Sequence, residues 1–257
     1  MQSIDRQHID ALLFDLDGVV TKTAVVHAAA WKRLFDEFLR RGASGQAWQP
    51  CDIERDYRAL VDGKPRRDGV RSFLESRGIF LPEGTPDDGP DAETIHGLAE
   101  RKNGYVLAHV EQKGVEPYEA AVAVIRAARA LGFKTAVVSA SENCAAVLAA
   151  ASLAELFDVR VDGTDIDRLG LRGKPAPDTF LEAARRLGVE PGRAVVLEDA
   201  IAGVQAGRAG GFALVVGVDR VGHAETLRRN GADVVVTQLS ELELAGGAAA
   251  RRGERRP

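Results

Sequence analysis

The chain has 257 residues, of which 45% are apolar and 28% are charged, and its formal net charge is −4. This composition supports a folded core and excludes a disordered chain, and it provides no strong basic field for nucleic acid or an anionic membrane. The polar N-terminus lacks the apolar core of a signal peptide, and no apolar run approaches membrane-spanning length. The two cysteines, Cys51 and Cys144, match no metal-binding spacing. We therefore expect a cytoplasmic monomer.

The first predicted strand covers residues 11–17 and ends in two carboxylates one residue apart, Asp15 and Asp17. Because like charges this close repel, such a strand end needs a compensating cation, a proton or hydrogen bonds. Residues 24–110 contain helical stretches, the clearest at 27–41, but no convincing strand. We expect a helical insertion that is joined to the core by two connections, which together can act as a hinge.

After the insertion, short apolar segments typical of buried parallel strands alternate with helical patterns. The four further strands are predicted at residues 134–141, 193–199, 212–218 and 233–238. The clearest helices are predicted at 118–132 and at 177–188, the second with Asp178 as its N-cap and Gly188 as its stop. This alternation predicts a doubly wound α/β sheet of the Rossmann type.

These patterns divide the chain into three kinds of segment. An α/β core is expected from residues 10–23 and 111–245, and an inserted, all-helical cap from residues 24–110. The terminal segments 1–9 and 246–257 are expected to be flexible, since they are polar or locally basic.

The predicted strand ends carry residues that could take part in catalysis or bind a metal ion. In open α/β sheets, sites form at the carboxyl ends of the strands, and here those ends and one loop supply Asp15, Asp17, Ser139, Lys174, Glu198 and Asp199. Taken singly, the acids would be read as turn or helix-cap residues. Taken together, they suit Mg²⁺ with a phosphate substrate, because one carboxylate can attack phosphorus and a second can move protons. The hydroxyl and the ammonium can bind phosphoryl oxygens.

Four segments, "FDLDGVVTKT", "VVSASEN", "GKPAPDTF" and "VVLEDAIAGVQAG", resemble the four motifs of the haloacid dehalogenase superfamily of phosphotransferases. The resemblance extends over residues 10–240, and within the superfamily the chain is most similar to the beta-phosphoglucomutase-like subfamily. It implies that Asp15 is the nucleophile and Asp17 the general acid and base. It also implies that Mg²⁺ is held by Asp15, the backbone carbonyl of Asp17, Glu198 and Asp199.

The same resemblance implies roles for residues around these acids. Ser139, the backbone N–H of Ala140 and Lys174 would bind the phosphate. Thr23 and His27 match hinge-side positions that steady the acid and base in the family. The helical insertion matches the family's cap, which closes over a sugar.

In the cap, "LVDGKPRRDG" lies where relatives carry a Lys-Gly loop followed by an Arg. Gly63 and Arg66 match by position, and Arg66 would grip the phosphate that is not transferred. The Lys of the pair is Asp62 here, with Lys64 two residues later, so either Lys64 substitutes or the substrate differs. Asn143 has two interpretations, as a substrate-binding residue and as the residue that opens the next helix.

The implied activity is the Mg²⁺-dependent interconversion of beta-glucose 1-phosphate and glucose 6-phosphate through a bisphosphate and an aspartyl phosphate. The alternative is a phosphatase that hydrolyses a sugar phosphate or a similar small ester. A signalling receiver domain carries a similar residue set, but its phosphorylated Asp ends the third strand and it lacks a large insertion. A catalytically inactive binding protein is disfavoured by the complete set of acids.

Overall fold

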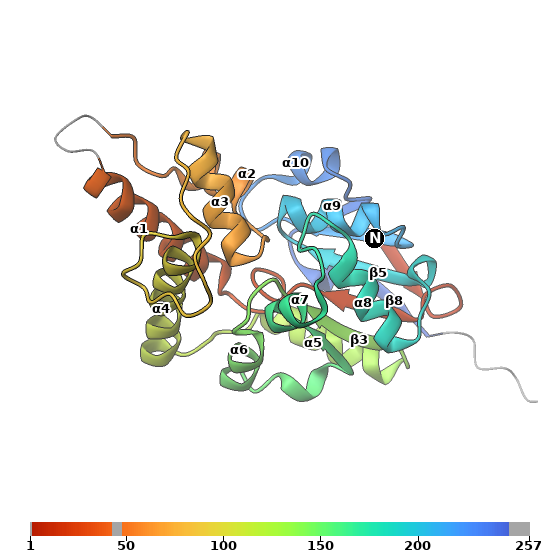
Figure 1. Cartoon of the computed structure of the whole chain (residues 1–257). Coiled ribbons are helices and arrows are strands. Elements are labelled where there is room, and N and C mark those ends of the chain that lie inside the picture. Colours follow the sequence, from red (N-terminus) through yellow and green to blue (C-terminus); the bar gives the residue numbers. More distant parts are fainter. Residues whose placement is uncertain (1, 43–47, 247–257) are drawn as a thin grey trace, which may run out of the picture.

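The computed structural model describes residues 2–42 and 48–246. Its core is a six-stranded, fully parallel sheet in the order β4-β3-β2-β5-β6-β7 (Figure 1). The strands are β2 (Ala11–Phe14), β3 (Lys134–Val138), β4 (Val159–Val161), β5 (Ala194–Glu198), β6 (Leu214–Val218) and β7 (Val234–Val236). The chain runs outward from β2 to β3 and β4, then crosses to β5 on the other side of β2. The ends of β2 and β5 therefore flank the point where the strand order reverses, which is where such sheets place their sites.

Strand β2 lies at the centre of the sheet and is buried on both faces. Leu12 and Phe14 join the apolar cluster on one face, and Ala11 and Leu13 join the cluster on the other. Helices α5 (Glu119–Ala130) and α6 (Cys144–Ala150) contribute to the first cluster, and α8 (Asp178–Leu187) and α9 (Ile201–Ala209) to the second. Burial on both faces is the reason that the strands are apolar without alternation. The predicted doubly wound α/β fold is confirmed.

Some local predictions need correction. Strand β4 was not predicted, because it has only three residues and Arg160 in its middle is exposed. Helix α8 has Pro177 at the N-cap position, so the assignment of Asp178 as the N-cap is wrong. The Asp178 carboxylate instead accepts hydrogen bonds from Arg172. The remaining core helices are α7 (Gly163–Leu169), α10 (Ala224–Arg229) and the 3₁₀ turns η2 (Ala154–Leu156), η3 (Pro191–Arg193) and η4 (Leu239–Glu241).

The two ends of the described chain pair with each other. Strand β1 (Gln2–Asp5) lies parallel to β8 (Leu242–Ala245), and the side chain of Ile4 is buried in the core. The expectation of a flexible segment at residues 1–9 is therefore wrong for residues 2–5. The expectation for residues 247–257 lies outside the described part of the chain.

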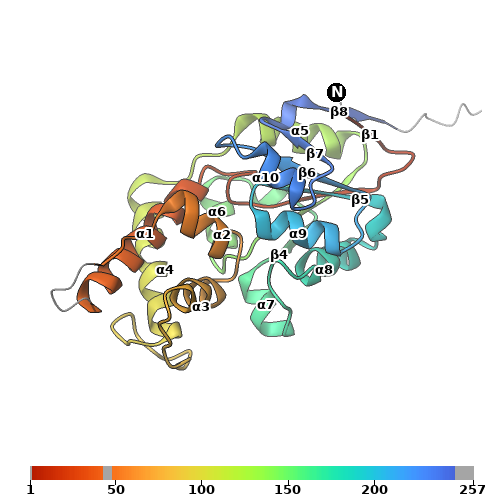
Figure 2. The ribbon, with the colours of Figure 1, turned by 90° about the horizontal axis from the view of Figure 1, so that it is seen from above.

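The insertion after β2 forms a group of helices beside the sheet (Figure 2). It comprises α1 (Ala24–Gly42), a π-helical turn η1 (Ile53–Tyr57), α2 (Arg58–Leu60), α3 (Arg66–Ser76) and α4 (Ile95–Lys113). These helices enclose an apolar cluster of their own, in which the rings of Trp31, Phe35 and Phe73 stack. Helix α4 continues three residues beyond the predicted boundary at residue 110. We propose that this group is a separate cap domain.

Two chain segments connect the cap to the core, and they lie side by side. The Lys22 N–H donates to the Glu116 carbonyl at 2.8 Å, and the Tyr118 N–H donates to the Val20 carbonyl at 2.8 Å. Lys22 and Glu116 also form an exposed ion pair at 2.8 Å. Paired connections of this kind are suited to a hinge. In the ranges covered by the structure, no helix has both the length and the apolar character of a membrane span.

Candidate active site

A small cavity lies at the carboxyl ends of the central strands, between the sheet and the cap helices. Its free volume is about 50 Å³, which is room for a few water molecules. The core side supplies Asp15, Asp17, Ala140, Ser141, Glu198, Asp199 and Ala200, and the hinge and cap supply Ala24, His27, Trp31, Tyr57, Val61, Asp62, Gly63, Lys64, Arg66 and Lys102.

Three of the carboxylates on the core side of the cavity lie close together. Because β2 and β5 are adjacent and in register, Asp15 lies beside Glu198, and one carboxylate oxygen each from Asp15, Glu198 and Asp199 lies within 4.8 Å of the others. Burial, followed by the charge of Glu198, raises the pKa of Asp15 well above its usual range. Burial and the nearby charge of Asp62 raise the pKa of Asp199 in the same way.

One buried cation partly compensates these acids. The Lys174 ammonium donates to Asp15 Oδ1 at 2.5 Å, to Glu198 Oε2 at 2.7 Å and to the Val138 carbonyl at 3.3 Å. Burial alone would lower the pKa of Lys174, but the two carboxylates outweigh it and raise this pKa. A single positive charge leaves three carboxylates undercompensated. A hard divalent cation with oxygen ligands fits this donor set.

Local sequence fixes the position of Glu198. Its Oε1 accepts the backbone N–H groups of Asp199 at 3.1 Å and Ala200 at 3.0 Å. Helix α9 packs over the same side chain, since a Cβ atom at Gly203 would lie 1.8 Å from Glu198 Oε2. Gly18 has a φ of +92°, and a Cβ atom there would lie 1.8 Å from Asp199 Oδ2. Glycine at both positions therefore lets the backbone approach the acids.

The Asp17 carboxylate has three polar neighbours. The Thr23 hydroxyl donates to Oδ1, and the Ser139 hydroxyl lies 3.4 Å from Oδ2. His27 Nε2 lies 3.6 Å from Oδ1. The two oxygens of Asp17 thus face separate partners, one group from the hinge and one from the end of β3.

Sequence analysis missed Lys102 in α4, which contacts His27. Lys102 Nζ lies 2.9 Å from His27 Nδ1, and both side chains are deep in the cavity wall. Burial, followed by the charge of Arg66, lowers the pKa of Lys102 to about 7. Burial, followed by Lys102, lowers the pKa of His27 to about 4, so His27 is neutral at neutral pH. The available signal was spacing, because Lys102 falls between the buried Leu98 and Val106 on one helix face.

The cap loop that contains Asp62 and Gly63 reaches the core. Gly63 has a φ of +74°, and a Cβ atom there would lie 3.0 Å from the Cβ of Ala200. The Tyr57 hydroxyl donates to Asp62 Oδ1 at 2.7 Å. Burial raises the pKa of Asp62 to about 6. An acid therefore occupies the loop position where relatives are expected to carry Lys.

Two cations follow in the same loop, and their partners differ. The Lys64 ammonium donates to Ser72 at 3.1 Å and contacts no acid of the site. Arg66 is 9% exposed, donates to Glu100 at 3.1 Å and forms a second ion pair with Glu142. Lys64 is thus turned toward α3, whereas Arg66 spans α4 and the loop after β3.

Asn143 lies at the start of α6, but its side chain does not cap that helix. Its amide donates to Asn103 Oδ1 in α4 at 2.7 Å and so links the core to the cap. Most of the predicted site residues line the cavity, and Thr23, Ser139 and Lys174 contact acids that line it. Asn143 does neither. The role of each of them in catalysis stays a prediction.

The family identity follows from comparison with known proteins. The chain belongs to the haloacid dehalogenase-like hydrolase family, whose model matches residues 9–211. It is 48% identical over 241 residues to the beta-phosphoglucomutase of Mycobacterium tuberculosis, covering 92% of each chain. A solved beta-phosphoglucomutase from Clostridium difficile superposes with a TM-score of 0.70 at 27% identity, covering 91% of this chain and 92% of that one. CbbY from Rhodobacter sphaeroides, solved with xylulose 1,5-bisphosphate, superposes with a TM-score of 0.68 at 26% identity, covering 92% and 97%.

Proposed function

We propose that this protein is a Mg²⁺-dependent beta-phosphoglucomutase that interconverts beta-glucose 1-phosphate and glucose 6-phosphate. The proposal rests on one observation above all. Asp15, Glu198 and Asp199 converge beneath a cap that brings Arg66 to the same cavity. The names of the relatives support the substrate class, since they include mutases and a structure with a sugar bisphosphate.

The acid cluster is the proposed magnesium site. Asp15, Glu198, Asp199 and the backbone carbonyl of Asp17 would hold the ion. When bound, Mg²⁺ neutralises the crowded acids and the phosphoryl oxygens, which otherwise repel the nucleophile. Lys174, already paired with Asp15 and Glu198, supplies a fixed positive charge in the same cluster.

Asp15 and Asp17 divide the covalent chemistry. A carboxylate oxygen of Asp15 forms a bond to phosphorus while the bond from phosphorus to the substrate oxygen breaks. Asp17 gives its proton to that leaving oxygen, and takes a proton from the attacking hydroxyl when the phosphoryl group returns. The Thr23 hydroxyl donates to Asp17 and would keep it in place for both steps, with the ring of His27 beside it.

The cap determines which acceptor reaches the phosphoaspartate. Closure of the cap over a bound sugar would exclude water, and exclusion of water favours transfer to a sugar hydroxyl over hydrolysis. Arg66 would bind the sugar's other phosphate, so that the bisphosphate can bind in either orientation. The paired connections at Lys22 and Glu116 would allow the opening in which it reorients.

A phosphatase that hydrolyses a sugar phosphate is the second candidate. It is favoured by the cap loop, where Asp62 replaces the expected Lys and Lys64 is engaged with Ser72. A weaker contact to the sugar would let water compete for the phosphoaspartate.

Incubation with beta-glucose 1-phosphate, Mg²⁺ and a catalytic amount of beta-glucose 1,6-bisphosphate distinguishes the two. We expect glucose 6-phosphate with little free phosphate, and no product from the Asp15→Ala variant. Release of phosphate without glucose 6-phosphate would reject the mutase in favour of the phosphatase. Full activity of Asp15→Ala would reject both.

A further inference from the structure

Arg66 has two acidic partners that come from different parts of the chain. Glu100 belongs to α4 in the cap, and Glu142 belongs to the loop between β3 and α6 in the core. The Arg66 side chain is only 9% exposed, whereas Glu142 is 37% exposed. The pair with Glu142 therefore crosses the interface between cap and core, at the edge of the cavity.

We propose that Glu142 is a specificity-determining residue that competes with the substrate's second phosphate for Arg66. This inference rests on the proposed function, in which Arg66 binds the phosphate that is not transferred. In this structure the Glu142 carboxylate lies against Nη2 of Arg66, one of the guanidinium nitrogens that a phosphate would use. The substrate must therefore displace this internal anion, and Glu142 sets how strongly a second phosphate is preferred.

The exchange of Glu142 for a phosphate at Arg66 follows from the charge and shape of the two anions. A phosphate carries more negative charge than a carboxylate and forms bidentate hydrogen bonds with a guanidinium, so it can displace Glu142. The displaced carboxylate can return to solvent, because it is already partly exposed. Glu100 can keep its contact at 3.1 Å throughout, since it lies in the cap together with Arg66.

Other contacts besides the pair between Arg66 and Glu142 join the cap to the core. Arg67 pairs with Asp167 of α7, and its Nη1 lies 3.2 Å from Asp167 Oδ2. A Cβ atom at Gly173 would lie 2.0 Å from Pro65 Cγ, which shows how closely this part of the cap approaches the core.

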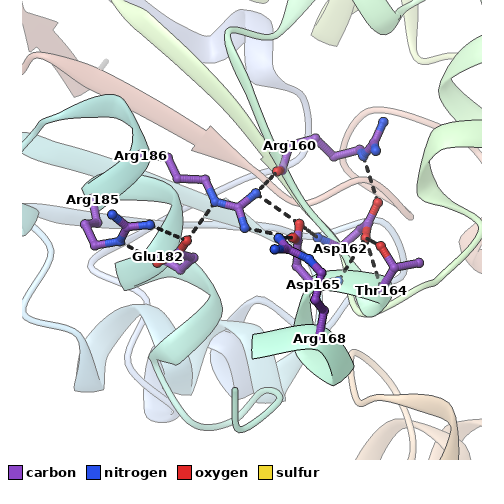
Figure 3. A network of polar contacts seen from close by, with 8 residues as sticks. All are labelled: Arg160, Asp162, Thr164, Asp165, Arg168, Glu182, Arg185 and Arg186. Carbon is purple, nitrogen blue, oxygen red and sulfur yellow. Dashed lines mark hydrogen bonds and ion pairs between the residues drawn. The ribbon is translucent and has the colours of Figure 1, made fainter. Parts of the chain in front are cut away.

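Helix α7 is itself anchored to the core. Asp165 of α7 accepts hydrogen bonds from both terminal nitrogens of Arg186 in α8 (Figure 3). Their lengths are 2.8 and 3.0 Å. Asp162 caps the start of α7 through the Thr164 N–H at 3.0 Å. Asp167 therefore lies on a helix that is anchored to the core, and its pair with Arg67 shares no residue with the pair between Arg66 and Glu142.

The test measures binding of beta-glucose 1,6-bisphosphate by calorimetry in the Asp15→Asn background, which cannot form the phosphoaspartate. Adding Glu142→Gln should tighten binding about threefold to tenfold, because a partly exposed ion pair contributes about 1 kcal/mol at most and a repulsive charge is removed as well. Asp167→Asn is the matched control, since it breaks the neighbouring pair across the same interface. It should leave the bisphosphate affinity within about twofold.

A double-mutant cycle shows whether Glu142 acts through Arg66. In an Arg66→Ala background, Glu142→Gln should no longer tighten binding. With Asp15 intact, Glu142→Gln should lower the KM for the bisphosphate more than the KM for para-nitrophenyl phosphate, which has no second phosphate.

Weaker or unchanged binding in Glu142→Gln would overturn the inference, and so would tightening that persists without Arg66. The calorimetric result does not require turnover, so it decides this inference even if the mutase assay fails. Conversely, the mutase assay can succeed while Glu142→Gln has no effect. The two failures are thus distinguishable.

Discussion

The Lys174→Met substitution tests the charge balance of the site most directly. It removes the ammonium but keeps a side chain of similar length. Lys174 is 1% exposed, and its partners Asp15 and Glu198 are 9% and 0% exposed. Breaking a buried pair leaves a buried charge uncompensated, which costs about 3–5 kcal/mol. For a chain of this size, this corresponds to a fall in Tm of about 6–20 °C.

The measurement is urea unfolding followed by circular dichroism, at pH 8 and pH 5, with EDTA present. Burial already raises the pKa of Asp15, and loss of Lys174 raises it further. At pH 5 the folded variant therefore binds a proton that the unfolded chain has largely released. The stability of the variant then falls as the pH rises, so the destabilisation should be larger at pH 8.

Lys22→Met is the matched control, because Lys22 pairs with Glu116 on the surface, where the side chains are 49% and 76% exposed. The free energy of unfolding should barely change in this variant. A loss below about 1 kcal/mol in Lys174→Met at pH 8 would refute the reasoning. An equal loss at pH 5 and pH 8 would refute the assignment to the buried acids.

Three further predictions concern the same site. Gly203→Ala places a Cβ atom 1.8 Å from Glu198 Oε2, so the carboxylate must move and Mg²⁺ affinity should fall more than tenfold by calorimetry; unchanged affinity would count against the site. Lys102→Met removes a positive charge and should raise the pKa of His27 above about 4 by NMR titration; a constant pKa would mean that burial alone sets it. Mg²⁺ at 100 times its Kd, added to EDTA-treated protein, should stabilise the fold by about 2.7 kcal/mol, and no rise in Tm relative to a KCl control would reject the metal site.

The sheet and the acids at its centre were predictable because their signals are local. A strand buried on both faces is a run of apolar residues, as in β2 and β5, and β3, β6 and β7 are apolar over most of their length. Polar residues directly after such runs must lie at one edge of a parallel sheet. Asp15 meets Glu198 and Asp199 because β2 and β5 are neighbours in the sheet. That these acids meet is expected from the rule for strand ends and from the resemblance to known motifs, without a predicted strand order.

The remaining features depend on contacts distant in sequence. Lys102 lies among charged residues in "AERKNGY", and its burial results from packing of α4 over the hinge. Glu142 lies in a motif loop and gives no sign that it will meet Arg66, which is 76 positions earlier in the numbering of the chain. Strands β1 and β8 are short and only partly apolar, and each is defined by the other. The pairing of two segments this far apart in the sequence cannot be read from the pattern of either segment alone.

The pairing of β1 with β8 makes the first and last strands of the described chain interdependent. In both ribbon views these strands lie on the side of the core away from the cap (Figures 1 and 2). Trimming residues 1–6 would expose the edge of β8 and empty the pocket that Ile4 fills. Such a truncation would create a surface prone to self-association while leaving every catalytic side chain present. Expression tags and fusion partners should therefore be added before β1, without replacing any residue of that strand.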